Sequence, residues 1–148
     1  MTLFFPDLNV WLALSDNSHE HNRGAWNWIS SLPRDARLVF SRYTQLGLLR
    51  LLTNTAVMGE ATLNLRAAWD VYDRWLEDPR VDFYPEPRGV DGAFRQLTEP
   101  FAKQQATKAL GDCWLLACAS GIDATLVTFD RALYYFSRKQ GCRAVTPS

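Results

Sequence analysis

The sequence lacks any apolar run long enough for a transmembrane helix, which needs about 18 residues or more. It also lacks an excess of charge of either sign, because 16 basic residues balance 16 acidic ones. This balance argues against a strongly basic module dedicated to nucleic-acid binding, although local basic patches are compatible with it. The sequence therefore predicts no transmembrane helix and no membrane partner, and it gives no global signature of a charged partner.

Cysteine is scarce and its spacing carries no motif. The three cysteines, Cys113, Cys118 and Cys142, form neither a C-x-x-C pair nor the even-numbered set of a disulfide framework. The N-terminus has no basic region followed by an apolar core of the secretory type. We therefore expect a cytoplasmic protein with free thiols.

Apolar residues make up 47% of the 148 positions, which is enough to bury the core of one domain. Short β-branched or apolar stretches alternate with segments of helical periodicity along the chain. The predicted strands cover residues 3–6, 37–40, 81–84, 124–129 and 142–145, and the predicted helices cover 9–14, 19–32, 43–52, 60–77, 90–101 and 112–121. This alternation predicts an α/β fold in one domain, residues 1–148, with layers around a mainly parallel sheet.

The chain is organised around the stretch LGDCWLLACASGIDATLVTFDR at residues 110–131. We expect a helix that opens on Asp112, ends at Gly121 in a left-handed conformation, and leads into a buried strand before Asp130. The strand at residues 3–6 likewise leads directly into Asp7.

Carboxyl ends of parallel strands meet at one edge of a sheet, so Asp7, Asp112 and Asp130 are predicted to converge. Such a group of carboxylates needs a neutralising cation, and oxygen ligands suit Mg²⁺ or Mn²⁺. Taken singly, each acid has a simpler interpretation, since Asp7 and Asp112 are suitable helix caps and Asp130 can begin a turn. Their shared placement at strand ends and helix starts favours a site.

Four segments in this order resemble the PIN-domain ribonucleases, in particular the VapC toxins of VapBC toxin–antitoxin pairs. The segments are PDLNVWLAL, SRYTQLGLLRLLTN, KALGDCWLLACASG and TLVTFDRAL, and HEHNRGAWNWI resembles the second helix of that family. The resemblance spans essentially the whole chain. It implies a PIN-like α/β/α sandwich with an acidic site that binds Mg²⁺ or Mn²⁺.

The resemblance also implies roles for individual residues. Asp7, Asp112 and Asp130 match the family's catalytic, metal-binding acids, and Thr128 matches a hydroxyl position that lines the site. One position departs, because Gln45 stands where the family usually has a glutamate. Gln45 either contributes an amide oxygen beside the metal or is only a polar residue near the cleft. Glu60 is an alternative source of the missing carboxylate, although a first-turn position in its own helix explains it more simply.

The function implied by the resemblance is hydrolysis of RNA by a metal-dependent endoribonuclease toxin. A VapB-type antitoxin and a second copy of the chain are the implied partners. Four basic residues flank the acidic segments: Arg42, Arg50, Lys108 and Arg131. They either contact RNA phosphates or serve as surface charge or as partners of the aspartates. Arg131 is the first candidate for a phosphate contact. The alternative is a PIN-like module that has lost catalysis and binds RNA or protein, and Gln45 is the residue that favours it.

Overall fold

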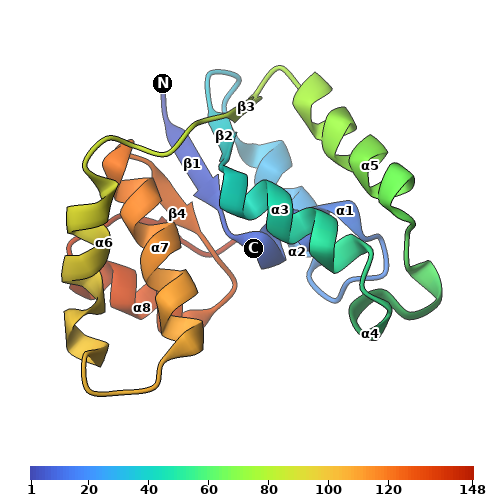
Figure 1. The fold of residues 1–148 in the computed structure, drawn as a ribbon. Helices are drawn as coiled ribbons and strands as arrows, with labels where there is room; N and C mark the ends of the chain where they lie inside the picture. The colour runs from blue at the N-terminus through green and yellow to red at the C-terminus, as the bar shows by residue number, and fades with distance from the viewer.

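A central sheet of five parallel strands organises the computed structural model, which describes residues 1–148. The strand order is β3-β2-β1-β4-β5, so the first strand lies in the middle (Figure 1). The strands are β1 (Leu3–Pro6), β2 (Arg37–Phe40), β3 (Val81–Phe83), β4 (Thr125–Val127) and β5 (Ala144–Val145). Every neighbouring pair is parallel, for example Phe4 with Leu38 of β2 and with Thr125 of β4.

Eight α-helices connect and cover these strands. They are α1 (Leu8–Ser15), α2 (Asn22–Ser31), α3 (Arg42–Leu52), α4 (Thr55–Met58), α5 (Leu65–Glu77), α6 (Val90–Thr98), α7 (Thr107–Gly121) and α8 (Arg131–Lys139). Two short 3₁₀ turns, Gly59–Ala61 and Glu99–Phe101, follow α4 and α6. None of the helices combines the length and the apolar character needed to cross a lipid bilayer.

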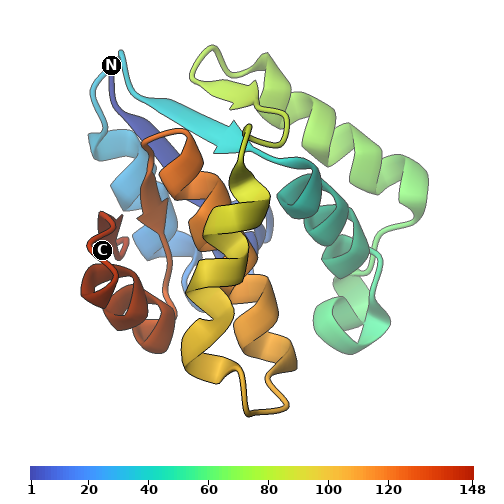
Figure 2. The same ribbon diagram turned by 60° about the vertical axis from the view of Figure 1, so that its left-hand side comes forward.

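The two faces of the sheet bury separate hydrophobic cores because side chains alternate along each strand. In β2, Leu38 and Phe40 belong to the core under α1, α2, α3 and α5, whereas Val39 belongs to the core under α6, α7 and α8. Trp11 of α1 is fully buried and stacks on Phe40 with 3.8 Å between ring centroids. Figures 1 and 2 show the helices on both sides of the sheet, with α6 lying along α7. The predicted α/β/α sandwich is confirmed, and its sheet is entirely parallel.

The order of the strands creates a crevice beside β1. The chain proceeds from β1 outward through β2 and β3, and then returns to the other side of β1 for β4 and β5. The connections that leave the carboxyl ends of β1 and β4 therefore diverge, and open α/β sheets bind ligands at such a switch point. Asp7 immediately follows β1, and Thr128 immediately follows β4.

The predicted strands are confirmed at their centres, but several predicted helix boundaries are wrong. Helix α7 begins at Thr107, so Asp112 lies in its second turn and does not open it. Its last residue, Gly121, is not left-handed, and the positive φ of 56° belongs to Asp123 two residues later. Helix α5 begins at Leu65 behind the capping side chain of Asn64, which accepts a hydrogen bond from the Ala67 N–H.

Candidate metal-binding site at the carboxyl ends of β1 and β4

Asp7 lies at the centre of the site and is 5% exposed. Its backbone N–H donates to the Val127 carbonyl at 2.9 Å, which extends the pairing of β1 with β4 by one residue. Its Oδ1 accepts from the Val10 N–H at 3.2 Å and caps helix α1. The capping role considered for Asp7 is thus confirmed, and the same geometry fixes the carboxylate at the switch point.

The hydroxyl of Thr128 joins two of the predicted acids. Thr128 is fully buried, and its Oγ1 donates a hydrogen bond to Oδ2 of Asp7. The same Oγ1 accepts from the backbone N–H of Asp130 at 3.0 Å. A single side chain therefore sets the position of Asp7 relative to the segment that carries Asp130.

Asp130 and Asp112 share one cation, the ammonium group of Lys108. Lys108 Nζ lies 2.5 Å from Oδ2 of Asp130 and 3.5 Å from Oδ2 of Asp112. Lys108 and Asp112 stand one helical turn apart in α7, at positions whose side chains meet. Asp130 caps α8, with its Oδ1 accepting from the Leu133 N–H at 3.2 Å.

The bridging position of Lys108 was not predicted from the sequence, where pairing with the aspartates was only a general alternative to RNA contact. The four-residue spacing to Asp112 was the available signal. It was hidden because the helix was predicted to begin at Asp112, whereas α7 begins at Thr107.

The charges of the three acids act on one another. Burial raises the pKa of Asp7 to about 6, and the charge of Asp112 adds to the rise. The hydrogen bonds that Asp7 accepts from Thr128 and from the α1 backbone oppose it. Burial also raises the pKa of Asp112, with Lys108 opposing the rise and Asp130 supporting it. The hydrogen bond from Lys108 holds the pKa of Asp130 below its usual value. These mutual effects identify the three carboxylates as one electrostatic group.

The donor set of this group is suited to a hard divalent cation, and a cationic side chain already neutralises two of its members. In the conformation with the Lys108 bridge, no three His, Cys, Asp or Glu side chains are close enough together to hold a metal ion. Chelation by Asp7, Asp112 and Asp130 therefore requires the carboxylates to turn toward a common point.

Gln45 forms no hydrogen bond with any of the three acids. It is 7% exposed, and its Oε1 accepts from Arg42 Nη1 at 2.5 Å. Gln45 also lies next to Tyr72 of α5. Burial raises the pKa of Tyr72, and the charge of Arg42 and a hydrogen bond from Gln45 partly oppose the rise. The structure thus pairs Gln45 with Arg42, three residues before it in α3, and with Tyr72 of α5.

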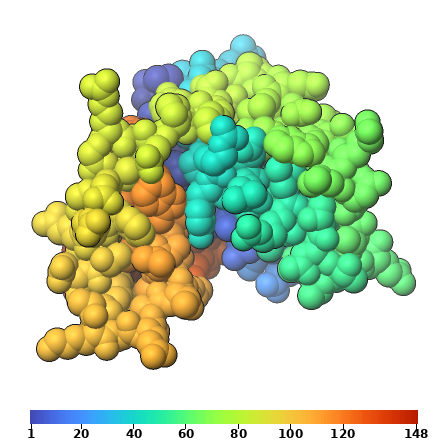
Figure 3. Space-filling model, in the orientation of Figure 1, coloured from blue at the N-terminus to red at the C-terminus, as the bar shows by residue number.

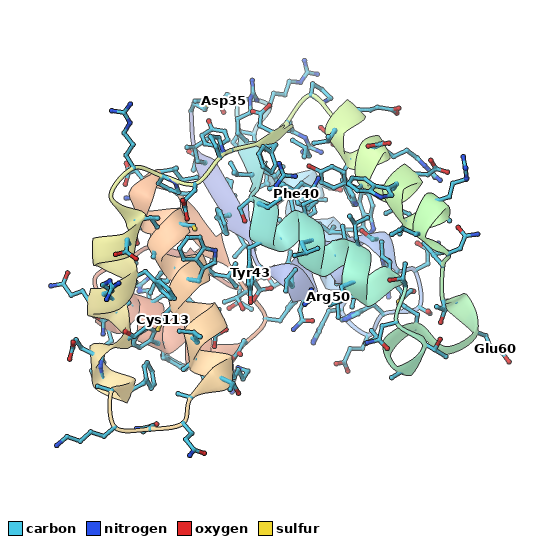
Figure 4. All side chains as sticks on the ribbon, in the orientation of Figure 1. Asp35, Phe40, Tyr43, Arg50, Glu60 and Cys113 are labelled. Carbon is cyan, nitrogen blue, oxygen red and sulfur yellow. The ribbon has the colours of Figure 1, made fainter.

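Glu60 is remote from α7, on the opposite side of the molecule in Figure 4. It is exposed in the 3₁₀ turn after α4, and Figure 4 shows its side chain pointing away from the molecule at the far end of α5. The suggestion that it replaces the missing glutamate is therefore wrong. The simpler interpretation is correct to the extent that Glu60 lies in the first turn of its own 3₁₀ helix.

Tyr43 and Gly47 are the α3 residues that face the carboxyl end of β1 and the start of α7. A β-carbon at Gly47 would lie 2.2 Å from Leu8 Cδ2, so the absence of a side chain allows α3 to pack against the start of α1. A β-carbon at Gly111 would lie 2.6 Å from the Tyr43 hydroxyl, which thus reaches the residue before Asp112. Tyr43 is labelled between α3 and α7 in Figure 4.

A cavity of about 440 Å³ opens next to Tyr43. Its walls come from β1, the start of α3, the segment after β3, and α7; aromatic side chains among them are Phe5, Tyr43, Tyr84 and Trp114. Figure 3 shows the surface hollowed between α3, in teal, and α7, in orange. Tyr43, which reaches the residue before Asp112, thus also lines this aromatic groove.

The basic residues of the flanking segments divide into three kinds. Lys108 pairs with the aspartates, and Arg42 lies over the Phe83 ring at 4.8 Å from its centroid. Arg50 is exposed on α3. Arg131 is exposed at the start of α8 and lines a separate hollow of about 490 Å³ with His21, which stacks on Phe129.

Comparison with known proteins connects this geometry to a family. The PIN-domain model matches residues 4–139. Ribonuclease VapC41 of Mycobacterium tuberculosis (strain CDC 1551 / Oshkosh) is 37% identical over 132 residues, which are 85% of this chain and 88% of that protein. The match thus includes nearly the full length of both chains.

Solved structures show the same fold at low sequence identity. VapBC-1 from nontypeable Haemophilus influenzae aligns over 98% of both chains with a TM-score of 0.71 and 17% identity. VapC20 of Mycobacterium tuberculosis, a toxin that cleaves the Sarcin-Ricin loop, aligns over 89% of this chain and 93% of its own, with a TM-score of 0.64 and 16% identity. With its parallel sheet and the full-length similarity to VapC41, the chain belongs to the PIN-domain family, among its VapC-type members.

Proposed function

We propose that this protein is a metal-dependent endoribonuclease and the toxin of a type II toxin–antitoxin pair, acting on RNA in the cytoplasm. The observation that carries the proposal is the linked group Asp7–Thr128–Asp130 with Asp112 beside it, at the switch point of a VapC-type fold. The similarity to Ribonuclease VapC41 supports RNA as the substrate.

Asp7, Asp112 and Asp130 are the residues that would hold Mg²⁺ or Mn²⁺. Such an ion supplies Lewis acidity and an acidified water near neutral pH. Thr128 orients Asp7 through its donated hydrogen bond and fixes the segment of Asp130 through the one it accepts. The helix caps made by Asp7 and Asp130 hold both residues at the carboxyl ends of β1 and β4, from where their carboxylates would turn toward a shared cation.

Contacts with RNA are proposed at the rim of the site. Arg131 is exposed and adjacent in sequence to Asp130, and a guanidinium there is suited to a phosphate contact. Arg42 is a poorer candidate because Gln45 and Phe83 already occupy its guanidinium.

A protein partner is proposed for the surface between α2 and α5. Trp26 is 42% exposed there and stacks on Trp75 of α5 with 5.7 Å between the ring centroids. Exposed apolar patches of this kind are typical of protein–protein contacts. We propose a VapB-type antitoxin as a partner, and also a homodimer; light scattering of the purified chain, alone and with its antitoxin, tests both.

The test of the enzymatic proposal is cleavage of a mixed RNA pool by the purified, antitoxin-free chain in Mg²⁺ or Mn²⁺. We expect cleavage that EDTA abolishes and that Asp112→Asn reduces by at least about a hundredfold, a typical loss for an essential electrostatic group. Asp70→Asn is the matched control, because Asp70 is exposed on α5.

A folded wild-type chain that cleaves no RNA under these conditions would contradict the enzymatic proposal and favour the binding-module alternative. Equal cleavage by wild type and Asp112→Asn would instead show that the nuclease site lies elsewhere. Circular dichroism of each variant verifies that the fold is retained.

A further inference from the structure

Lys108 is positioned as an internal cation of the acidic group. Its ammonium lies 2.5 Å from Asp130 and 3.5 Å from Asp112, so one side chain neutralises two acids from different elements. Asp112 comes from the second turn of α7 and Asp130 from the cap of α8. Lys108 is the only basic side chain that forms an ion pair with any of the three acids.

The same side chain is held loosely. Lys108 is 74% exposed in its side chain, whereas Asp112 and Asp130 are 25% and 27% exposed. It stands in the first turn of α7, whose N-cap residue Ala106 contributes no side-chain hydrogen bond. A hollow of about 260 Å³ between α7 and α8 is lined by Lys108, Asp112, Ala132 and neighbouring apolar side chains, so the ammonium has space to move.

We propose that Lys108 is a displaceable counterion: it occupies the carboxylate pair Asp112–Asp130 in the metal-free protein and leaves when a divalent cation binds. The inference rests on the proposed function, because it takes the acidic group to be the metal site. A divalent ion brings two positive charges where the lysine ammonium brings one. The carboxylates of Asp112 and Asp130 are less exposed to water than the Lys108 side chain, so water weakens their attraction to the ion less than it would at the surface.

Two consequences follow from this exchange of cations. Metal binding is weakened by the lysine, because each ion that enters must first break both ion pairs. The metal-free fold is stabilised by the lysine, because without it Asp112 and Asp130 repel each other and Asp7. Removal of the Lys108 charge should therefore have opposite effects on metal affinity and on metal-free stability.

The experiment compares wild type with Lys108→Met, which keeps much of the length and apolar stem of lysine. Mn²⁺ binding is measured by titration calorimetry without RNA, and the melting temperature is measured in EDTA and in Mn²⁺. We expect Lys108→Met to bind Mn²⁺ about three- to tenfold more tightly, the range set by one or two partly exposed ion pairs. We also expect it to melt at a lower temperature in EDTA and to gain more from Mn²⁺ than wild type does.

Two matched variants separate charge from side-chain loss. Lys103→Met removes an exposed lysine from the loop before α7 and should leave Mn²⁺ affinity unchanged. Lys108→Arg keeps the charge and should remain close to wild type in both measurements.

Suppose that wild type binds Mn²⁺ through Asp112 but that Lys108→Met binds it no more tightly. That result would overturn the proposed role of Lys108 and leave the metal site standing. If Asp112→Asn binds Mn²⁺ as wild type does, or if wild type binds none, the proposed metal site itself is refuted and the inference with it. The two failures are thus distinguished by the Asp112→Asn measurement.

Discussion

At the scale of single residues, Asp7 combines a structural and a proposed chemical role. Its carboxylate caps α1 and accepts from Thr128, yet burial raises its pKa to about 6. The ionised form is therefore held in the fold at a cost to stability that a bound cation would offset.

The pH dependence of stability tests this cost. Because the pKa of Asp7 is about 6 in the folded protein, against an ordinary value of 3.8, the folded protein binds the proton more tightly than the unfolded chain does. Ionisation of Asp7 therefore lowers the free energy of unfolding as the pH rises from about 4 to above 6. Asp7→Asn keeps a good helix cap and removes the titration. In EDTA we expect the variant to gain up to about 3 kcal/mol over wild type at pH 8 and almost nothing at pH 4. Urea denaturation at both pH values measures the difference, and a gain that is equal at the two would contradict the role of burial.

Gln45 gives a second prediction at this scale. Since its amide bonds with Arg42 and Tyr72, a carboxylate at the same position should pair with Arg42 and stay away from the acidic group. We expect Gln45→Glu to leave Mn²⁺ affinity within about twofold of wild type. Calorimetric titration measures it, and a clear increase in affinity would mean that the side chain turns toward Asp7 when metal binds.

At the scale of elements, the sequence predicted most of the sheet and less of the helix ends. Residues 37–40 are a strand with the predicted bounds, because an apolar stretch between Pro33 and a capping serine leaves little choice. The start of α7 was misplaced because its N-cap residue is Ala106, which has no capping side chain, and no side chain caps this helix. Helix α8 was not predicted at all, although Asp130 caps it.

The site was predictable to the same degree. Asp7, Thr128 and Asp130 each follow a strand, so sequence position alone brings them to one edge of the sheet. The orientation of Gln45 depends on how α3 rotates against α5, which is decided by contacts with Tyr72 that are distant in sequence. Local pattern carries no information about that rotation.

Two glycines in helices test the packing of these elements. A β-carbon at Gly24 in α2 would meet nothing within 4 Å, whereas one at Gly47 in α3 would meet Leu8 at 2.2 Å. We expect Gly24→Ala to stabilise the protein by about 0.5–1 kcal/mol, because alanine favours the helix. Gly47→Ala should destabilise it by about 1–3 kcal/mol through overpacking. Thermal or urea unfolding measures both.

The double variant Gly47→Ala, Leu8→Ala serves as the control for this contact. It should recover part of the loss relative to Leu8→Ala alone, because the side chain that obstructs the β-carbon is gone. Strictly additive losses would show that Leu8 is not the obstacle.

At the scale of the whole molecule, the formal net charge is zero, but the charged side chains are not evenly distributed. The three acids gather at the carboxyl ends of the strands, and Asp35 lies near the amino ends, where Figure 4 labels it. RNA attraction must therefore come from local cations near the site, since the net charge is zero.

Arg131 is the cation whose removal should reveal this local attraction. In an Asp112→Asn background that prevents cleavage, we expect Arg131→Gln to weaken RNA binding and to reduce the slope of log affinity against log salt by about 0.7–0.9, the value for one phosphate contact. Arg34→Gln, in the exposed turn before β2, is the control and should change neither. Fluorescence anisotropy of labelled single-stranded RNA over a salt series provides both quantities.

The central place of β1 in the sheet also bears on biosynthesis. Asp7 emerges early from the ribosome, but its neighbours Asp112, Thr128 and Asp130 are synthesised only when α7 and β4 have followed. A nascent or truncated chain that ends before residue 112 has Asp7 alone, and one that ends before residue 130 still lacks Asp130. The cell that makes this protein is therefore exposed to a complete acidic group only after nearly the whole chain has been translated.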